Sequence, residues 1–198
     1  MSEKNNRIER YFDIQARSAN EGNDKMVIEG YALKFDKETE LWKGFNEVID
    51  RTALTNTDMS RVFLLLNHDA NKILAGTTNG SLELDVDDVG LRFKAELVDT
   101  PTSKEVYTLA KQGLLAKCSF SFRCASGGYL YCDRDDDTLG IVKDIETLFD
   151  VAVVTYPAYD DTECFARDKR ALEEEKKARI NEERANKAKE RMEQLEWN

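Results

Sequence analysis

The chain has a single histidine, His68, and a strand-like run over 114–123 in which serine alternates with apolar residues. Side chains of a strand point alternately to its two faces, so Ser119 and Ser121 share one face and the apolar residues the other. A hydroxyl becomes a nucleophile when an imidazole removes its proton and a third group holds the imidazole tautomer. These residue types predict that Ser119 and His68 meet as nucleophile and base. The simpler alternative is that both are surface residues at strand edges.

A candidate for the third group lies in the most β-prone run of the chain, 148–155. Asp150 interrupts this apolar run, and a buried carboxylate without a partner is costly. We therefore expect Asp150 either to face solvent at a sheet edge or to have a specific partner. No Gly-x-Ser-x-Gly motif surrounds any serine, so the sequence does not indicate an α/β-hydrolase.

The cysteines provide a weaker alternative nucleophile. None of them forms a Cys-x-x-Cys pair, and the only histidine lies far upstream, so we expect neither a metal site nor a cofactor. We interpret them as small buried residues or free thiols. The four cysteines are Cys118, Cys124, Cys132 and Cys164.

The acidic loop 133–137 lacks the spaced ligands of a calcium-binding loop, and we interpret it as a solvated hairpin tip.

Length and charge limit the class of protein. A chain of 198 residues with 41% hydrophobic residues can form one domain with an appendage. Its formal net charge of −10 argues against nucleic-acid binding, which needs a basic surface. No apolar run approaches the roughly 20 residues of a membrane span, and the N-terminus has no apolar signal-peptide region. We expect a cytosolic type of protein.

Alternating apolar and polar residues predict a mainly β chain with one helix. The helix is expected to begin at a capping box formed by Thr102 and Glu105 and to end at Gly113. The first two predicted strands are expected to pair as a hairpin, and so are the fifth and sixth. The strands are expected at 8–17, 26–35, 45–50, 62–66, 80–86, 90–97, 114–123, 129–132, 139–142 and 148–155.

The composition changes abruptly at about residue 167. From there Glu, Lys, Arg and Ala dominate, and oppositely charged residues four apart favour a solvated helix. We therefore predict two parts: a domain over 1–165 and a charged helical tail over 166–198.

Seven segments and one glycine follow one another in a characteristic order and spacing: 28–35, 45–49, 67–69, 73–84, 90–93, Gly113, 118–122 and 150–159. Together they resemble the prohead (procapsid maturation) proteases of tailed bacteriophages. The resemblance covers roughly residues 8 to 165. It implies a serine endopeptidase with a fold similar to the herpesvirus assemblin protease, a closed mixed β-barrel of about seven strands wrapped by a few helices.

The resemblance also implies roles for individual residues. The histidine of the family falls on His68 and its nucleophile on Ser119. Ser121 stands at a position where glycine is usual, which leaves Ser121 as the alternative nucleophile. The third member is acidic in this family and falls on Asp150, where glutamate would be one methylene longer. Nearby alternatives for this third member are Glu146 and Asp144.

The implied substrates are the phage major capsid protein and scaffolding protein, and the protease itself, with self-association possible. The implied location is the host cytoplasm, inside the immature prohead, with no nucleic-acid or membrane partner. The tail over 166–198 would be a packaging or self-cleaved segment. Two alternatives are an inactive capsid-assembly module of the same fold, and a protease whose tail begins a fused scaffold.

Overall fold

The computed structural model of the protein describes residues 8–13 and 25–155. These residues form twelve strands, one α-helix, α1 (Pro101–Lys111), and one short 3₁₀ helix, η1 (Thr77–Asn79). The strands are β1 (Ile8–Asp13), β2 (Val27–Lys34), β3 (Thr39–Trp42), β4 (Phe45–Ile49), β5 (Phe63–Leu66), β6 (Asp69–Gly76), β7 (Leu82–Val86), β8 (Gly90–Glu96), β9 (Lys117–Cys124), β10 (Tyr129–Asp133), β11 (Thr138–Val142) and β12 (Ile145–Val154).

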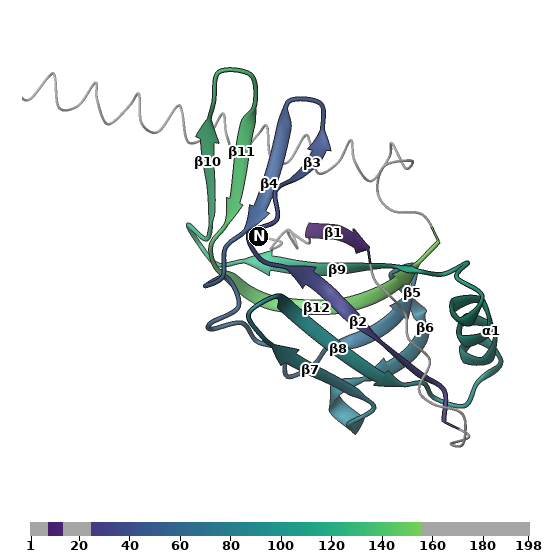
Figure 1. Ribbon diagram of the computed structural model, residues 1–198. Coiled ribbons are helices and arrows are strands. Elements are labelled where there is room, and N and C mark those ends of the chain that lie inside the picture. The colour runs from purple at the N-terminus through teal and green to yellow at the C-terminus, as the bar shows by residue number, and fades with distance from the viewer. Residues whose placement is uncertain (1–7, 14–24, 156–198) are drawn as a thin grey trace, which may run out of the picture. The chain divides into compact units, whose positions relative to one another are not determined.

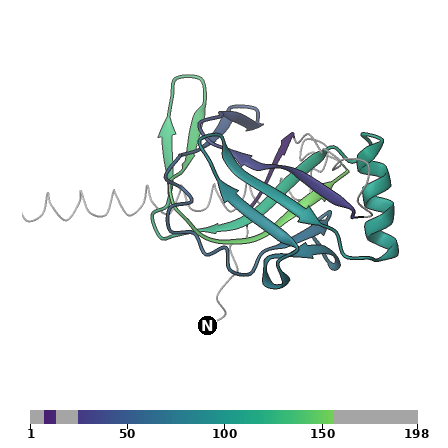
Figure 2. The same ribbon diagram turned by 60° about the horizontal axis from the view of Figure 1, so that its bottom comes forward.

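The strands form three sheets, with orders β1-β9-β12-β5-β6, β10-β11-β4-β3 and β2-β8-β7. The pairs β12–β5 and β11–β4 are parallel, and the other pairs are antiparallel. In Figure 1 the strands β9 and β12 run side by side through the middle, and β2 and β8 cross in front of them. The helix α1 lies at one end of these strands, and the β10–β11 hairpin projects at the other (Figure 1, Figure 2).

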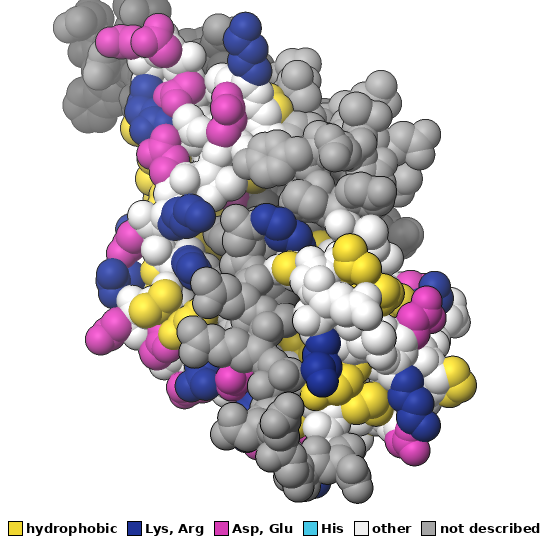
Figure 3. Space-filling view, turned by 45° about the vertical axis from the view of Figure 1, so that its right-hand side comes forward, with side chains coloured by type: hydrophobic (Ala, Val, Ile, Leu, Met, Phe, Trp, Pro, Cys, Tyr) yellow, Lys and Arg dark blue, Asp and Glu magenta, His cyan; other side chains and the backbone are white. Residues whose placement is uncertain are grey.

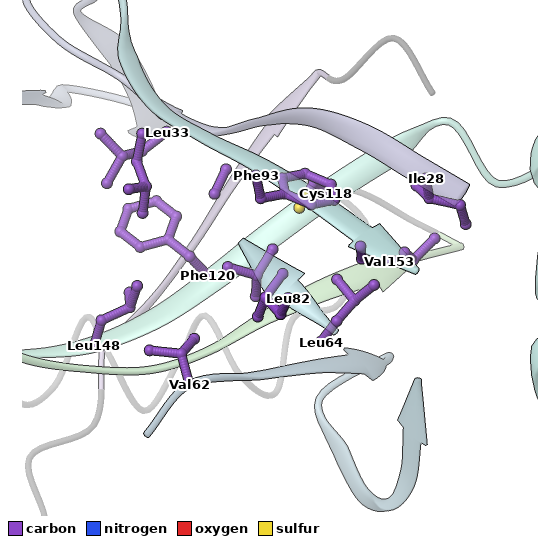
Figure 4. Packing of buried hydrophobic residues seen from close by; sticks show 14 of the residues in the cluster. Ile28, Leu33, Val62, Leu64, Leu82, Phe93, Cys118, Phe120, Leu148 and Val153 are labelled. Carbon is purple, nitrogen blue, oxygen red and sulfur yellow. The ribbon is translucent and has the colours of Figure 1, made fainter. Parts of the chain in front are cut away.

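The hydrophobic core lies between the five-stranded and the three-stranded sheets. In Figure 4 Leu33 of β2, Phe93 of β8 and Phe120 of β9 lie in this core, with the ring of Phe120 next to Leu33. These three side chains are fully buried, as is Leu64 of β5. Burying apolar side chains of this size contributes about 1.5–3 kcal/mol each, so this layer holds β9 and β5 in place.

The expected closed barrel is wrong, although the described part of the chain is mostly β. Each of the three sheets has two open edges: β1 and β6, β10 and β3, β2 and β7. Only one α-helix is found in the described residues, where the resemblance implied several. Alternating strands with one apolar face suit a barrel and a pair of packed open sheets equally well. The strand partners, which the local pattern does not encode, decide between them.

Two local predictions also differ from the structure. The first two strands do not form a hairpin, because β1 pairs with β9 and β2 pairs with β8. The helix begins earlier than expected: Thr100 is the N-cap, its side chain accepts a hydrogen bond from the Ser103 N–H, and Pro101 follows as the first helical residue. Proline suits that position because its missing N–H is not needed there.

Charges on the described surface are mixed. Figure 3 shows acidic and basic side chains interspersed on one face of the molecule. Arg134 binds both Glu38 and Asp137, so the acidic loop after β10 is partly neutralised from within.

No helix among the described residues is long and apolar enough to cross a membrane. The predicted charged tail helix and the boundary at 165/166 lie outside the described residues, and nothing in the structure supports that helix.

Candidate active site

The neighbouring strands β9 and β12 bring the predicted nucleophile and carboxylate to the same face. In their antiparallel register Ser121 stands opposite Asp150, and Ser119 stands opposite Ala152. A register shift between Leu148 and Asp150 places an extra residue in β12 just before the carboxylate. Such irregularities often redirect a side chain beside an active site.

The two faces of this sheet have different surroundings. The apolar residues that alternate with the serines belong to the main core together with Val151 and Val153 of β12, as the alternation in the sequence predicted; they are Cys118, Phe120 and Phe122. The opposite face carries Ser119, Ser121 and Asp150 beside a small separate apolar cluster. Both serines are fully buried, and Asp150 is 2% exposed. Hydrogen bonds are stronger in such a low-dielectric environment, and an unpaired charge there is costly. The cluster consists of Leu65, Ala152, Val154 and, packed against it, Phe63.

His68 lies in a tight turn between β5 and β6. Leu66 pairs with Asp69, so only two residues form the turn, and both have positive φ, 52° at Asn67 and 56° at His68. A two-residue hairpin turn of this hand requires positive φ at both positions. Asn and His tolerate this conformation better than most residues, but it still costs about 1 kcal/mol per residue. The strain is retained at the residue whose side chain the site uses.

Asn67 attaches this turn to the end of β12. Its backbone N–H donates to the Val153 carbonyl (2.9 Å), and its Oδ1 accepts from the Thr155 N–H (3.0 Å). Because β5 runs parallel to β12, the turn that follows β5 lies beside the end of the strand that carries the carboxylate. The histidine is thus held relative to Asp150 by backbone contacts as well as by its own ring.

The imidazole of His68 spans the other two residues. Its Nδ1 lies 2.6 Å from Asp150 Oδ1, and its Nε2 lies 2.5 Å from Ser119 Oγ. With an ionised carboxylate as acceptor, Nδ1 carries the proton and Nε2 accepts the hydrogen bond from the serine hydroxyl. This arrangement can remove a proton from Ser119 and stabilise the positive charge that then forms on the ring.

The alternative residues occupy other positions. Ser121 Oγ donates to the second oxygen of Asp150, Oδ2, at 2.6 Å. Glu146 is exposed and paired with Arg123 Nε at 2.7 Å. Asp144 lies just before β12, where its backbone carbonyl accepts a hydrogen bond from the N–H of Ala125, the residue that follows β9. Cys118 points into the main core, where burial raises the pKa of its thiol well above the usual range. A thiol of this kind is a poor nucleophile.

Sequence reasoning did not assign roles to two residues of this group. Ser121 was considered only as an alternative nucleophile, and its spacing of two from Ser119 does indicate the shared face. For Asn67 the available signal is the preference of asparagine for tight turns, which does not show that its side chain contacts the end of β12. Among the described residues no cluster of His, Cys, Asp and Glu could hold a metal ion.

Comparison with known proteins identifies one relationship. The family model that describes the caudovirus prohead serine proteases matches residues 12–178. Neither a curated protein nor a solved structure matches the chain, so the expected similarity to the assemblin protease has no support from that comparison.

Proposed function

Because the chain belongs to the caudovirus prohead serine protease family, we propose that it cleaves peptide bonds with Ser119 as nucleophile, His68 as general base and Asp150 as the orienting carboxylate. One observation carries the assignment: a single imidazole hydrogen-bonds Ser119 Oγ through one nitrogen and Asp150 Oδ1 through the other. A nucleophile, a base and an orienting group in contact are the general signature of serine catalysis.

The proposed reaction has two halves. Ser119 Oγ attacks the scissile carbonyl while His68 Nε2 takes its proton, and the imidazolium then gives that proton to the leaving amine. Water, activated by the same imidazole, hydrolyses the acyl-enzyme and regenerates the serine. Backbone N–H groups are expected to stabilise the oxyanion in both halves.

Asp150 performs two tasks in this scheme. It keeps the proton on Nδ1, so that Nε2 is free to accept the serine proton, and it stabilises the imidazolium. Loss of this function in a serine protease, with the geometry kept, lowers kcat about 10⁴-fold. We expect a loss of that order for Asp150→Asn here.

The proposed substrates are the major capsid protein and the scaffolding protein of the phage, and the protease chain itself. The family acts in proheads, so the reaction would take place inside the immature shell in the host cell. Residues 166–198 are a proposed self-cleaved or packaging segment. If the intact tail persisted in mature particles and its deletion left encapsidation unchanged, this role of the tail would be rejected.

The test is co-expression of the chain with the capsid and scaffolding proteins encoded beside it. Wild type, Ser119→Ala and Ser121→Ala are compared, and the intact mass of every component is measured. Truncated products are expected in wild type and none with Ser119→Ala. Equal cleavage by wild type and Ser119→Ala would overturn the assignment of the nucleophile, and the mass differences would locate each cleaved bond.

A non-catalytic capsid-assembly module is the second candidate. The full burial of Ser119 favours this candidate. A substrate carbonyl can reach the buried hydroxyl only after a local movement of the chain. A fluorophosphonate distinguishes the two, because it reacts with an activated serine. Labelling of Ser119 in wild type but not in His68→Ala supports the protease. Absence of labelling and of cleavage in the co-expressed material supports the assembly module.

A further inference from the structure

We propose that Ser121 is a positioning residue whose hydroxyl holds the Asp150 carboxylate in the orientation that presents Oδ1 to His68. The inference rests on the proposed function of the His68–Ser119–Asp150 group. It assigns distinct tasks to two serines that the sequence alone presents as equivalent.

The geometry around the carboxylate carries the proposal. Asp150 Oδ1 lies 2.6 Å from His68 Nδ1, and Asp150 Oδ2 lies 2.6 Å from Ser121 Oγ. The terminal torsion of an aspartate is soft, so one hydrogen bond alone leaves the carboxylate plane poorly determined. Two donors on different oxygens determine both the plane and the oxygen that faces the imidazole.

The strand register explains why Ser121 takes this task. It stands directly opposite Asp150 in the antiparallel pair, where side chains are close enough to interact. Ser119 stands opposite Ala152, which has no acceptor in its side chain, and its hydroxyl donates to the imidazole instead. The two hydroxyls therefore have different acceptors: the Asp150 carboxylate for Ser121, and the His68 imidazole for Ser119.

Burial increases the effect of the hydrogen bond. Ser121 is fully buried and Asp150 nearly so. A hydrogen bond to a charged group contributes about 1.5–3 kcal/mol, and a buried acceptor that loses its donor incurs a desolvation cost. Truncation of Ser121 removes this hydrogen bond from Oδ2, and the carboxylate is then held less firmly in the orientation that presents Oδ1 to His68.

The single histidine allows a direct test. In protein labelled with ¹⁵N-histidine, every ring signal comes from His68, and the Nδ1–H proton reports its hydrogen bond to Asp150. We expect a slowly exchanging, low-field Nδ1–H signal in wild type and in Ser119→Ala, and its loss or marked upfield shift in Ser121→Ala. The backbone amide spectrum checks that each variant is folded.

The activity arm uses the co-expressed capsid and scaffolding proteins. Ser121→Ala should lower kcat about 10²-fold with little change in KM, as misplacement of catalytic groups does. Ser121→Thr, which keeps the hydroxyl, should recover the Nδ1–H signal and most of the rate. If Ser121→Ala does not fold, Ser121→Cys is used in its place, because it keeps the volume and has only a weak donor.

The outcomes separate the two proposals. An unchanged Nδ1–H signal together with an unchanged rate in a folded Ser121→Ala overturns the positioning role. Loss of the signal in Ser121→Ala supports that role even if no variant cleaves any substrate, in which case only the proposed protease function fails. If Ser121→Ala and a folded Ser121→Thr lost the Nδ1–H signal and the cleavage rate to the same extent, Ser121 would act through packing alone and the proposal would be rejected.

Discussion

Asn67 Oδ1 accepts a hydrogen bond from the backbone N–H of Thr155, which ties the residue before the histidine to the residue after β12. His68 and Asp150 are 82 residues apart in the chain, and this contact joins their two segments in addition to the pairing of β5 with β12. The positive φ at the first position of the turn and part of the attachment of the turn to β12 therefore depend on the same residue.

Asn67→Gly separates these two tasks. Glycine adopts φ of 52° without strain but lacks the side-chain acceptor. We expect the hairpin to remain and the cleavage rate to fall about tenfold or more, because the imidazole is less well placed. Asn67→Asp keeps the acceptor for the Thr155 N–H and should cleave at close to the wild-type rate. Rates on one co-expressed substrate measure the difference, and a Gly variant as fast as wild type would contradict the prediction.

Asp150→Glu should be destabilising on its own, because it adds a methylene at a buried position. Overpacking of this kind costs about 1–3 kcal/mol of unfolding free energy. Ser121→Gly removes a side chain directly opposite and makes room for the longer carboxylate. In a double-mutant cycle from urea denaturation we expect a favourable coupling of at least about 0.5 kcal/mol. Strict additivity of the two changes would show that they do not share the same space.

Cys118 should be inert to thiol reagents in the folded protein. Its side chain is fully buried, and burial raises the pKa of its thiol, whereas Cys132 is exposed. Brief treatment with iodoacetamide should modify Cys132 and leave Cys118 unmodified by peptide mass analysis. The same treatment after unfolding in urea should modify both. Modification of Cys118 in the native protein, with loss of cleavage, would restore the cysteine alternative.

Acid should destabilise the protein partly through Asp50. Hydrogen bonds from Lys143 and Thr52 hold the pKa of this carboxyl well below its ordinary value. The unfolded chain therefore binds a proton here at a higher pH than the folded chain. The stabilisation is fully present above about pH 4, the ordinary Asp value, and is lost as the pH falls towards the folded pKa.

The matched variants for this carboxyl are Asp50→Asn and Lys143→Gln. Both should lower stability at pH 7 and should flatten its decrease between pH 5 and pH 3, as measured by urea denaturation at each pH. If the free energy of unfolding of both variants decreased between pH 5 and pH 3 as steeply as that of wild type, Asp50 would contribute nothing to the acid sensitivity.

Much of the candidate site follows from local sequence patterns. Alternation around Ser119 predicts one face with hydroxyls and another that is buried in the core, and the structure has this arrangement. The unusual carboxylate in the apolar run ending at Thr155 predicts that Asp150 either faces solvent at a sheet edge or has a specific partner, and in the structure it is buried with His68 and Ser121 as partners. Both deductions use only the two-residue period of a strand and the cost of burying a charge, which are properties of short segments.

Tertiary structure alone decided how these segments meet. Which serine contacts His68 depends on whether Ala152 or Asp150 lies across the strand, and which carboxylate contacts His68 depends on where the turn after β5 ends. The same holds for the three open sheets in place of a closed barrel. A strand's period determines which side chains share a face, but the identity and register of its partner are set by packing between residues far apart in the chain.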